Sequence, residues 1–274
     1  MVKVNRKFVQ IISTVITNAN IKGFKGQGIY KGPLKKGCVP VLNCYSCPLA
    51  VSSCPIGSIQ AILASGKYKF PFYILGILML IGVFLGRLVC GFLCPFGFVQ
   101  DILYKIKIPK FKLPNWIKYI KYVVLLIFVI LLPILWTNEL GMGDPAFCKY
   151  ICPVGTLEGG IPLILMSNSL RNFIGFLFKW KMVILIATII LSIYTFRPFC
   201  KAICPLGAIY SFFNPISIYR LKIDKDKCIS CKKCSKVCNM GVEIYKNPNS
   251  LECIRCGECI RACPSKAIKT IINL

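Results

Sequence analysis

Long apolar runs separated by short basic segments extend along most of the chain. Three of these runs, at 70–86, 122–137 and 182–196, contain 17, 16 and 15 residues without a charge. A membrane-spanning helix needs about 20 predominantly apolar residues, so each run is at the short end for a crossing. A fourth run, at 8–21, is interrupted by polar residues and predicts either a short span or a helix lying in the membrane interface. The pattern therefore predicts a mainly α-helical membrane protein with three to four transmembrane helices.

The composition of the chain changes near residue 221. Only four acidic residues precede this point, whereas five acidic and eleven basic residues follow it within 53 residues. The shortage of acidic residues favours membrane spans over buried helices of a large soluble core, which is the alternative. The sequence therefore predicts an N-terminal interfacial or short-span segment at 1–69, transmembrane helices at 70–221 and a small soluble domain at 222–274.

Basic residues predict the orientation of the chain in the membrane. The segment 87–121 holds seven Lys or Arg against one Asp, whereas 138–181 holds four basic and three acidic residues. Because cytoplasmic segments are enriched in Lys and Arg, the first segment is predicted in the cytoplasm and the middle of the second outside. This topology places the C-terminal domain in the cytoplasm. The net charge of +26 is then explained by lysines at the membrane surface, and nucleic-acid binding is not expected.

The C-terminal domain carries two cysteine runs of identical C-x2-C-x2-C-x3-C spacing, and Pro264 follows the second. This spacing is typical of bacterial ferredoxins with two [4Fe–4S] clusters, in which the fourth cysteine of each run ligates the other cluster. Structural zinc is the alternative, although it rarely needs an interleaved set of eight cysteines. The domain is therefore predicted to have the α+β fold of a two-cluster ferredoxin. One cluster is predicted on Cys228, Cys231, Cys234 and Cys263, and the other on Cys253, Cys256, Cys259 and Cys238.

Ten further cysteines lie upstream of this domain. Six of them form three copies of a CxxxCP motif, each followed by a glycine two residues after the proline. A spacing of four puts both thiols on one face of a helical turn, and the proline then ends or kinks the helix. On the predicted topology, the first and third copies lie on the cytoplasmic side, and the second shares the outer side with four N-terminal cysteines. The predicted second-tier metal sites are Cys90, Cys94, Cys200 and Cys204 together, and Cys148 and Cys152 with some of Cys38, Cys44, Cys47 and Cys54.

The alternative for these ten cysteines is that they are free or disulfide-forming thiols that pack helix ends. The chain has 18 cysteines and no histidine, so b-type haem and catalytic zinc, which normally use histidine ligands, are not expected. Small secreted disulfide scaffolds are also rich in cysteine, but this chain is 56% hydrophobic with a mean hydropathy of +0.67. Any further redox chemistry is therefore expected to use sulfur ligands.

The motifs resemble those of the NapH-type membrane polyferredoxins, and more widely the [4Fe–4S] proteins that include the membrane regulator of nitrous oxide reductase. The shared segments are Gly86–Asp101, Arg197–Ala208 and the C-terminal cysteine runs. Two segments depart from the pattern, because Gly143–Gly160 adds a third CxxxCP motif and Asn43–Gly57 adds further cysteines. The resemblance implies a multi-span protein of the cytoplasmic membrane that passes electrons, without a specific role in nitrate or nitrous oxide reduction.

The predicted function is electron transfer between a cytoplasmic or quinol donor and a membrane or extracytoplasmic acceptor, by a subunit rather than a complete enzyme. The expected cofactors are two [4Fe–4S] clusters and one or two further iron–sulfur sites. The expected partners are membrane lipid and electron donor and acceptor proteins. A maturation or redox-regulatory factor for a partner metalloenzyme is the alternative, and a thiol–disulfide relay through the CxxxCP pairs is a third hypothesis.

Overall fold

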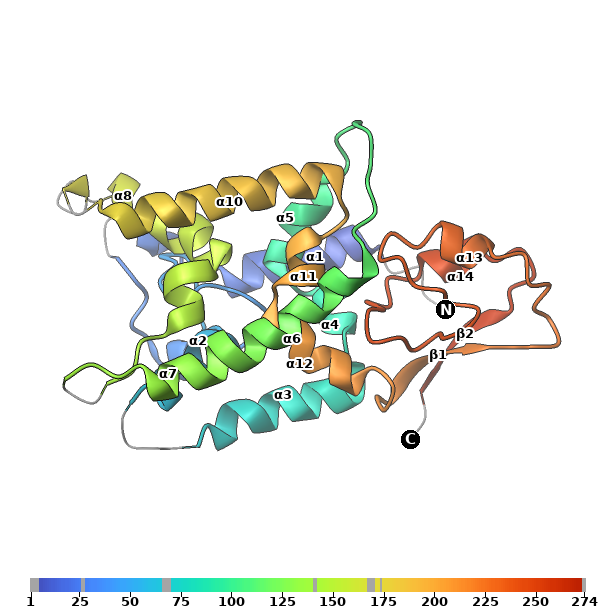
Figure 1. The fold of residues 1–274 in the computed structure, drawn as a ribbon, viewed down its shortest axis with the longest axis horizontal. Coiled ribbons are helices and arrows are strands. Elements are labelled where there is room, and N and C mark those ends of the chain that lie inside the picture. Colours follow the sequence, from blue (N-terminus) through green and yellow to red (C-terminus); the bar gives the residue numbers. More distant parts are fainter. Residues whose placement is uncertain are drawn as a thin grey trace.

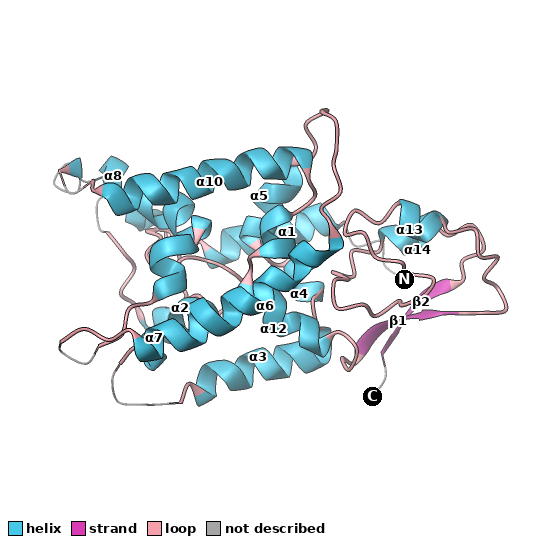
Figure 2. Ribbon diagram, in the orientation of Figure 1, coloured by secondary structure: helices cyan, strands magenta, loops and turns pink. Residues whose placement is uncertain are grey.

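The computed structural model describes residues 5–25, 28–65, 70–139, 142–166, 171–172 and 174–272. A bundle of helices, here called the helical body, forms the larger part, and a small module with two strands is attached to one end of it (Figures 1 and 2). The α-helices of the body are α1 (Arg6–Thr17), α2 (Pro55–Leu63), α3 (Phe72–Leu85), α4 (Leu88–Phe92), α5 (Pro95–Leu103), α6 (Ile120–Val124), α7 (Leu132–Leu135), α8 (Ile161–Met166), α10 (Phe176–Tyr194), α11 (Pro198–Ala202) and α12 (Pro205–Phe213).

Shorter helical segments of other types complete the body. The 3₁₀ segments are η1 (Ile21–Lys25), η2 (Pro33–Lys36) and η3 (Asn115–Tyr119), and the π-helical segments are η4 (Leu125–Leu131), η5 (Phe147–Ile151) and η6 (Gly155–Gly160).

Within the described parts of the chain, two helical stretches are long and apolar enough to cross a membrane, by length and composition. They are Asn115–Leu135, which joins η3, α6, η4 and α7, and α10, with 21 and 19 residues. The rest of the protein buries only 22% of the most apolar part of the first stretch and 17% of that of the second. Long apolar surfaces are therefore left uncovered by protein. The other two predicted runs form the shorter helices α3 and α1, of 14 and 12 residues. The presence of three to four crossings therefore stays a prediction.

Helix α1 has its polar face inside and its apolar face outside. Gln10 is buried and donates to Asp101 Oδ2 at 3.0 Å, and Ser13 donates to the Leu93 carbonyl at 2.8 Å. Phe8 and Ile16, in contrast, are 62% and 63% exposed. In water this arrangement would expose apolar surface at a cost of about 25 cal/mol per Å². An inverted helix of this kind is expected where the surrounding solvent is apolar.

The proline of each CxxxCP motif begins a new helix. Cys94 and Cys204 have extended backbones and directly precede Pro95 and Pro205, the first residues of α5 and α12. The residue before a proline is pushed away from the helical region, whereas proline itself is favoured at the first helical position. The prediction that both thiols of a motif share one helical turn is therefore wrong here, because the second cysteine lies at the start of the next helix.

The two ends of the C-terminal module pair with each other as strands. Strand β1 (Tyr219–Ile223) pairs antiparallel with β2 (Ile268–Ile272), with Leu221 opposite Thr270. The short helices α13 (Lys233–Lys236) and α14 (Glu258–Ala262) lie between the strands in the sequence. The predicted boundary between 221 and 222 falls inside β1, so the first strand of the module begins at Tyr219.

The module packs closely on the helical body next to the first CxxxCP motif. A Cβ atom at Gly91 would lie 2.5 Å from the carbonyl oxygen of Ile254, so only glycine allows this approach. Asn214, just after α12, donates to the carbonyls of Ser250 and Cys253 at 2.9 and 2.7 Å. These contacts fix the position of the second cysteine run relative to the body.

Candidate metal centres

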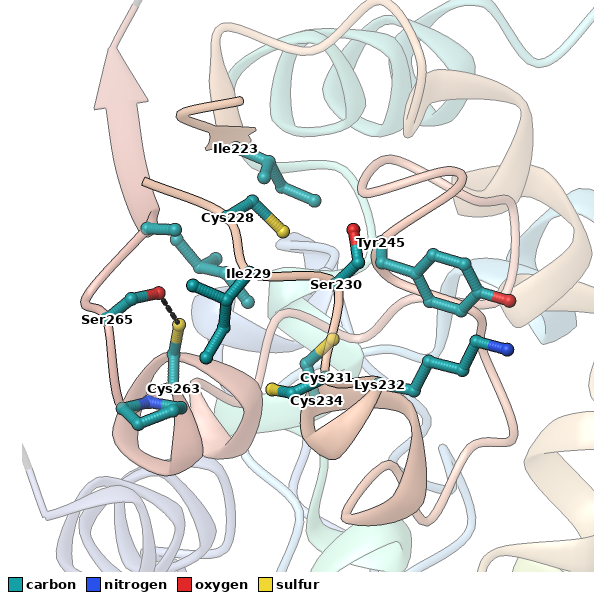
Figure 3. A pocket seen from close by; sticks show the side chains of 13 residues that line it. Ile223, Cys228, Ile229, Ser230, Cys231, Lys232, Cys234, Tyr245, Cys263 and Ser265 are labelled. Atoms are coloured by element: carbon teal, nitrogen blue, oxygen red, sulfur yellow. Dashed lines mark hydrogen bonds between the residues drawn. The ribbon is translucent and has the colours of Figure 1, made fainter. Parts of the chain in front are cut away.

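One set of four cysteines lines a pocket of the C-terminal module (Figure 3). Cys228, Cys231 and Cys234 come from the first cysteine run, and Cys263 comes from the second. Cys231 is exposed, so this pocket lies at the surface of the module. The four residues predicted for the first cluster are thus brought to one place.

A second set lies deeper in the module. Cys253 and Cys259 are buried in its apolar core, with Cys238 and Cys256 packed against them. Burial first, and then the neighbouring Cys256 and Cys238, raise the pKa of Cys253 to about 11 and that of Cys259 to about 12. All four residues lie in or against this one apolar cluster, whereas metal binding by them stays a prediction.

A third set, here called the proximal set, lies in the helical body. Cys90, Cys94, Cys200 and Cys204 line one pocket, together with the backbone segment Pro40–Leu42. The helices α4 and α5 position the first two thiols, and α11 and α12 position the other two. The predicted meeting of the first and third CxxxCP motifs is present, whereas metal binding by these thiols stays a prediction.

A fourth set, here called the distal set, consists of Cys44, Cys54, Cys148 and Cys152 at the opposite end of the body. A Cβ atom at Gly57 would lie 3.8 Å from Cys148 Sγ and 4.0 Å from Cys54 Cβ. The pKa of Cys148 is raised by burial and then by the nearby thiols of Cys152, Cys54 and Cys44. The second CxxxCP motif therefore meets two of the four N-terminal cysteines.

The thiols of these sets do not converge on single points. Among the described residues, no three Cys, Asp or Glu side chains form a group that could hold one metal ion. The first set and the proximal set instead line pockets, and a cubane of four irons and four sulfides occupies more room than an ion. The donor chemistry fits such a cluster, because iron–sulfur clusters are held by four cysteine thiolates.

A pair of sequence repeats, missed in the analysis of the cysteine spacing, underlies the proximal and distal sets. The pattern CPxGxxQ occurs at 54–60 and 94–100, and the pattern FCKxICPxG occurs at 147–155 and 199–207. Each set combines one copy of each pattern. Gln60 donates from Nε2 to Cys148 Sγ at 3.2 Å, and Gln100 donates from Nε2 to Cys200 Sγ at 3.2 Å. A comparison of the chain with itself beyond the cysteines would have revealed this repeat.

Two fully buried arginines flank the proximal set. Arg197 donates to the Cys90 carbonyl at 2.6 Å, and Arg87 donates to the Cys200 carbonyl at 3.4 Å. Arg197 is paired with Asp101, through Nε to Oδ1 at 2.7 Å and Nη2 to Oδ2 at 2.6 Å. Burial opposes ionisation of Asp101, but the hydrogen bonds and charge of Arg197 hold its pKa below the usual value. A cubane with four thiolates is a net anion, so these cations suit it electrostatically.

The buried carboxylate of Glu252 connects the module to the proximal set. It directly precedes Cys253 and accepts from Arg87 Nη1 at 2.8 Å, and it also forms an ion pair with Lys121. Burial opposes its ionisation, but Arg87 and Lys121 lower its pKa below the usual value. Since Arg87 lines the proximal pocket and Glu252 adjoins Cys253, this ion pair links the pocket to the second cysteine run of the module.

The distal set has a different electrostatic environment. The half-buried Glu158 accepts from the backbone N–H of Cys44 at 2.8 Å, and desolvation raises the pKa of Glu158 to about 7. Lys181 donates to the Cys148 carbonyl at 3.1 Å. The distal set therefore has one carboxyl group and one lysine where the proximal set has two paired arginines.

Two family models match this chain. A 4Fe-4S binding domain matches residues 70–115, 122–161 and 180–225, and a 4Fe-4S dicluster domain matches residues 220–264. An uncharacterised protein of Methanocaldococcus jannaschii is 31% identical over 225 residues, which cover 78% of this chain and 84% of that protein. The chain belongs to this family of 4Fe–4S binding proteins, as its motifs predict.

More distant relatives agree with the resemblance found in the motifs. The ferredoxin-type protein NapH of Haemophilus influenzae is 24% identical over 184 residues, covering 47% of this chain and 62% of that protein. The regulatory protein NosR of Pseudomonas aeruginosa is 23% identical over 181 residues, covering 62% of this chain and 22% of that protein. No solved structure matches the chain. The protein is thus an iron–sulfur protein of the ferredoxin type, a class that transports electrons.

The bond from Gln100 to Cys200 provides a spectroscopic test of cluster binding at the proximal set. Hydrogen bonds to cluster sulfurs raise the reduction potential, so Gln100→Leu should lower the potential of a cluster at this set by some tens of millivolts. A redox titration followed by low-temperature EPR would measure the shift. Gln60→Leu is the matched control, because Gln60 contacts the distal set and its loss should leave the proximal potential unchanged. An unchanged potential in Gln100→Leu would contradict the assignment.

Proposed function

We propose that this protein is an electron-transfer subunit of the cytoplasmic membrane, which passes electrons between a soluble carrier at the C-terminal module and an acceptor or donor in or across the membrane. The observation that carries the proposal is the continuous order of the cysteine sets. The first set, which includes the exposed Cys231, is followed by the second set, which includes the buried Cys253 and Cys259. The ion pair of Glu252 and Arg87 joins the second set to the proximal set. This order would provide a route for electrons from the surface of the module into the helical body.

The segment that leads from Pro40 to Cys44 supports an extension of this route. Pro40, Val41 and Leu42 line the proximal pocket, and Cys44 belongs to the distal set. The Tyr210 hydroxyl donates to the Pro40 carbonyl at 3.0 Å and holds this segment against α12. Two sets joined by five consecutive residues are close enough to exchange electrons if both hold clusters.

The uncovered apolar helices and the inverted helix α1 support a position in a lipid bilayer. The lysine distribution supports an orientation with the module in the cytoplasm. In that orientation the first CxxxCP motif and the module lie on one side, and the distal set lies toward the other side. The acceptor or donor at the distal end would then be quinol or an extracytoplasmic protein.

The surface around the first set supports an acidic soluble protein as the partner at the module. Ile229 is 67% exposed beside Cys228, and exposed lysines outnumber the two nearby aspartates. Complementary charge steers association and orients the partner, and its effect falls with ionic strength. The lysines are Lys225, Lys227, Lys232, Lys233 and Lys236.

Lipid vesicles provide the direct test of this function. The purified protein is inserted into vesicles that contain quinone in the bilayer and enclose ferricyanide, and a reduced acidic ferredoxin is added outside. The enclosed ferricyanide should lose its absorbance several-fold faster than in vesicles without protein, and the rate should fall when salt is raised from about 0.05 to 0.5 M. A rate equal to that of protein-free vesicles, with the clusters of the module fully reduced, would refute the proposal.

A further inference from the structure

The two repeats make the proximal and distal sets equivalent except at one position. In the proximal set, Cys90 lies four residues before Cys94. In the distal set the equivalent of Cys94 is Cys54, and the residue four positions before it is Ala50. The distal set therefore retains three equivalent thiols and lacks the fourth at its expected place in the sequence.

We propose that Cys44 supplies the missing fourth thiolate, so that Cys44, Cys54, Cys148 and Cys152 hold a [4Fe–4S] cluster, and that Cys38 and Cys47 are not ligands. The inference rests on the proposed function, because it assigns the ligands at the distal end of the same electron route. The four ligands come from two separate parts of the chain, one near the N-terminus and one after the helical stretch that ends at Leu135.

The position of the Cys44 thiol carries this assignment. Its Sγ atom lies against the turn that follows Cys152, where Cβ atoms at Gly155 and Gly159 would be 3.7 and 3.4 Å away. Side chains at these glycines would occupy the space beside the thiol. The backbone N–H of Cys44 donates to Glu158 Oε2 at 2.8 Å, which fixes the loop against η6. The thiol is thus held beside Cys152 by the same segment that follows the second CxxxCP motif.

The surroundings of Cys148 match those of its counterpart in the proximal set. Gln60 donates to Cys148 Sγ as Gln100 donates to Cys200 Sγ, both at 3.2 Å. Each glutamine amide also bonds to the carbonyl one turn earlier, at Ile56 and Phe96. Because a donor to a thiolate sulfur stabilises the charged form, the repeated bond indicates the same ligand role for both cysteines.

The thiols of the two other N-terminal cysteines, Cys47 and Cys38, contact residues outside the distal set. Cys47 Sγ lies 3.7 Å from Asn18 Oδ1, at the C-terminal end of α1. Cys38 pairs with Ser53 in an isolated parallel bridge, and its Sγ lies 3.8 Å from the Val39 carbonyl. Burial raises the pKa of Cys38 to about 12, and Cys54 is the thiol that contributes to that shift. The pKa of the Cys44 thiol, in contrast, is raised by both Cys152 and Cys54.

Single alanine variants of the full-length protein, purified anaerobically in detergent, test the ligand set. Four clusters correspond to about 16 iron atoms per chain, because each cluster carries four. Cys44→Ala should lower the iron content by about four atoms, to the level of Cys152→Ala. Cys38→Ala and Cys47→Ala are the matched controls and should keep the full content. The EPR signals of the module must remain in every variant, which separates loss of one site from failure to fold.

Three outcomes would overturn the assignment. Loss of about four irons in Cys38→Ala or Cys47→Ala, with Cys44→Ala unaffected, would show that another cysteine is the fourth ligand. Equal loss in all three variants would show that the site is not restricted to these four thiols. About 12 iron atoms in the unmodified protein, unchanged in Cys44→Ala, would show that the distal set holds no cluster. Reduction of a cluster at the proximal set by a soluble carrier at the module does not depend on these outcomes, so the proposed electron transfer into the helical body is tested separately.

Discussion

Replacing Cys90 and Cys204 together by serine is expected to remove about four iron atoms per chain and to abolish electron transfer beyond the module. Cys204 is buried and Cys90 is half-buried, and burial raises the pKa of both thiols, that of Cys204 well above its usual value. A buried thiolate is unfavourable unless a metal ion offsets the loss of its hydration, so a thiol without metal should stay neutral and titrate with a thiol reagent after unfolding. Iron analysis, EPR and the vesicle assay together measure the effect.

The module provides the internal control for this variant, because its eight cysteines are unchanged and its two EPR signals should persist. The double variant Cys38→Ala/Cys47→Ala controls for the removal of two upstream thiols. A content of only eight iron atoms in the unmodified protein, with the CxxxCP cysteines titrating as free thiols, would rule out clusters in the helical body. The protein would then be a ferredoxin module attached to apolar helices.

The variant Glu252→Gln is expected to destabilise the attachment of the module by about 3–5 kcal/mol. Removing this carboxylate leaves the fully buried Arg87 and Lys121 without their anionic partner. Loss of one partner of a buried ion pair costs far more stability than loss of one partner of a surface pair, because the remaining charge stays buried. The temperature at which the visible absorbance of the clusters bleaches should fall by several degrees. Electron transfer from the module to the proximal set should also slow, because Glu252 directly precedes Cys253.

Glu243→Gln is the matched control for this prediction. Glu243 lies in the same module and pairs with Lys246, but both side chains are more than half exposed. Exposed ion pairs contribute little to stability, so the clusters of this variant should bleach at nearly the same temperature as those of the unmodified protein. Equal effects of the two variants would mean that the buried ion pair does not join the module to the body.

The structure also explains how the two repeated patterns, CPxGxxQ and FCKxICPxG, produce two sites with different surroundings. The repeats place a glutamine amide on one thiol of each set, whereas the charges come from residues outside the repeats. Arg87 and Arg197 flank the proximal set, and Glu158 and Lys181 flank the distal set. The potentials of two clusters with the same ligand type can differ for this reason, because nearby charge and hydrogen bonding set the potential.

The sequence by itself determined the class of this protein, because the spacing of cluster ligands is a local property. The first three cysteines of each run, separated by two residues, are spaced to bind one cubane whatever the rest of the chain does, so the module was predictable from Cys228–Cys238 and Cys253–Cys263. The apolar runs predicted helices for the same reason, because the length and composition of a run are properties of one segment. The topology argument also predicted which CxxxCP motifs meet, because lysine counts assign segments to sides of a membrane.

Only the tertiary structure decided which N-terminal thiols meet the second CxxxCP motif. Residues 38–54 contain little regular structure, so no periodicity in the sequence predicts that Cys44 faces Cys152 while Cys47 faces Asn18. The ion pair between Arg87 and Glu252 joins residues 165 positions apart, and the inverted burial of α1 depends on its contact with Asp101. Such features depend on how distant segments pack, because a buried charge pairs with a residue that lies near it in the fold, however far apart the two are in the sequence.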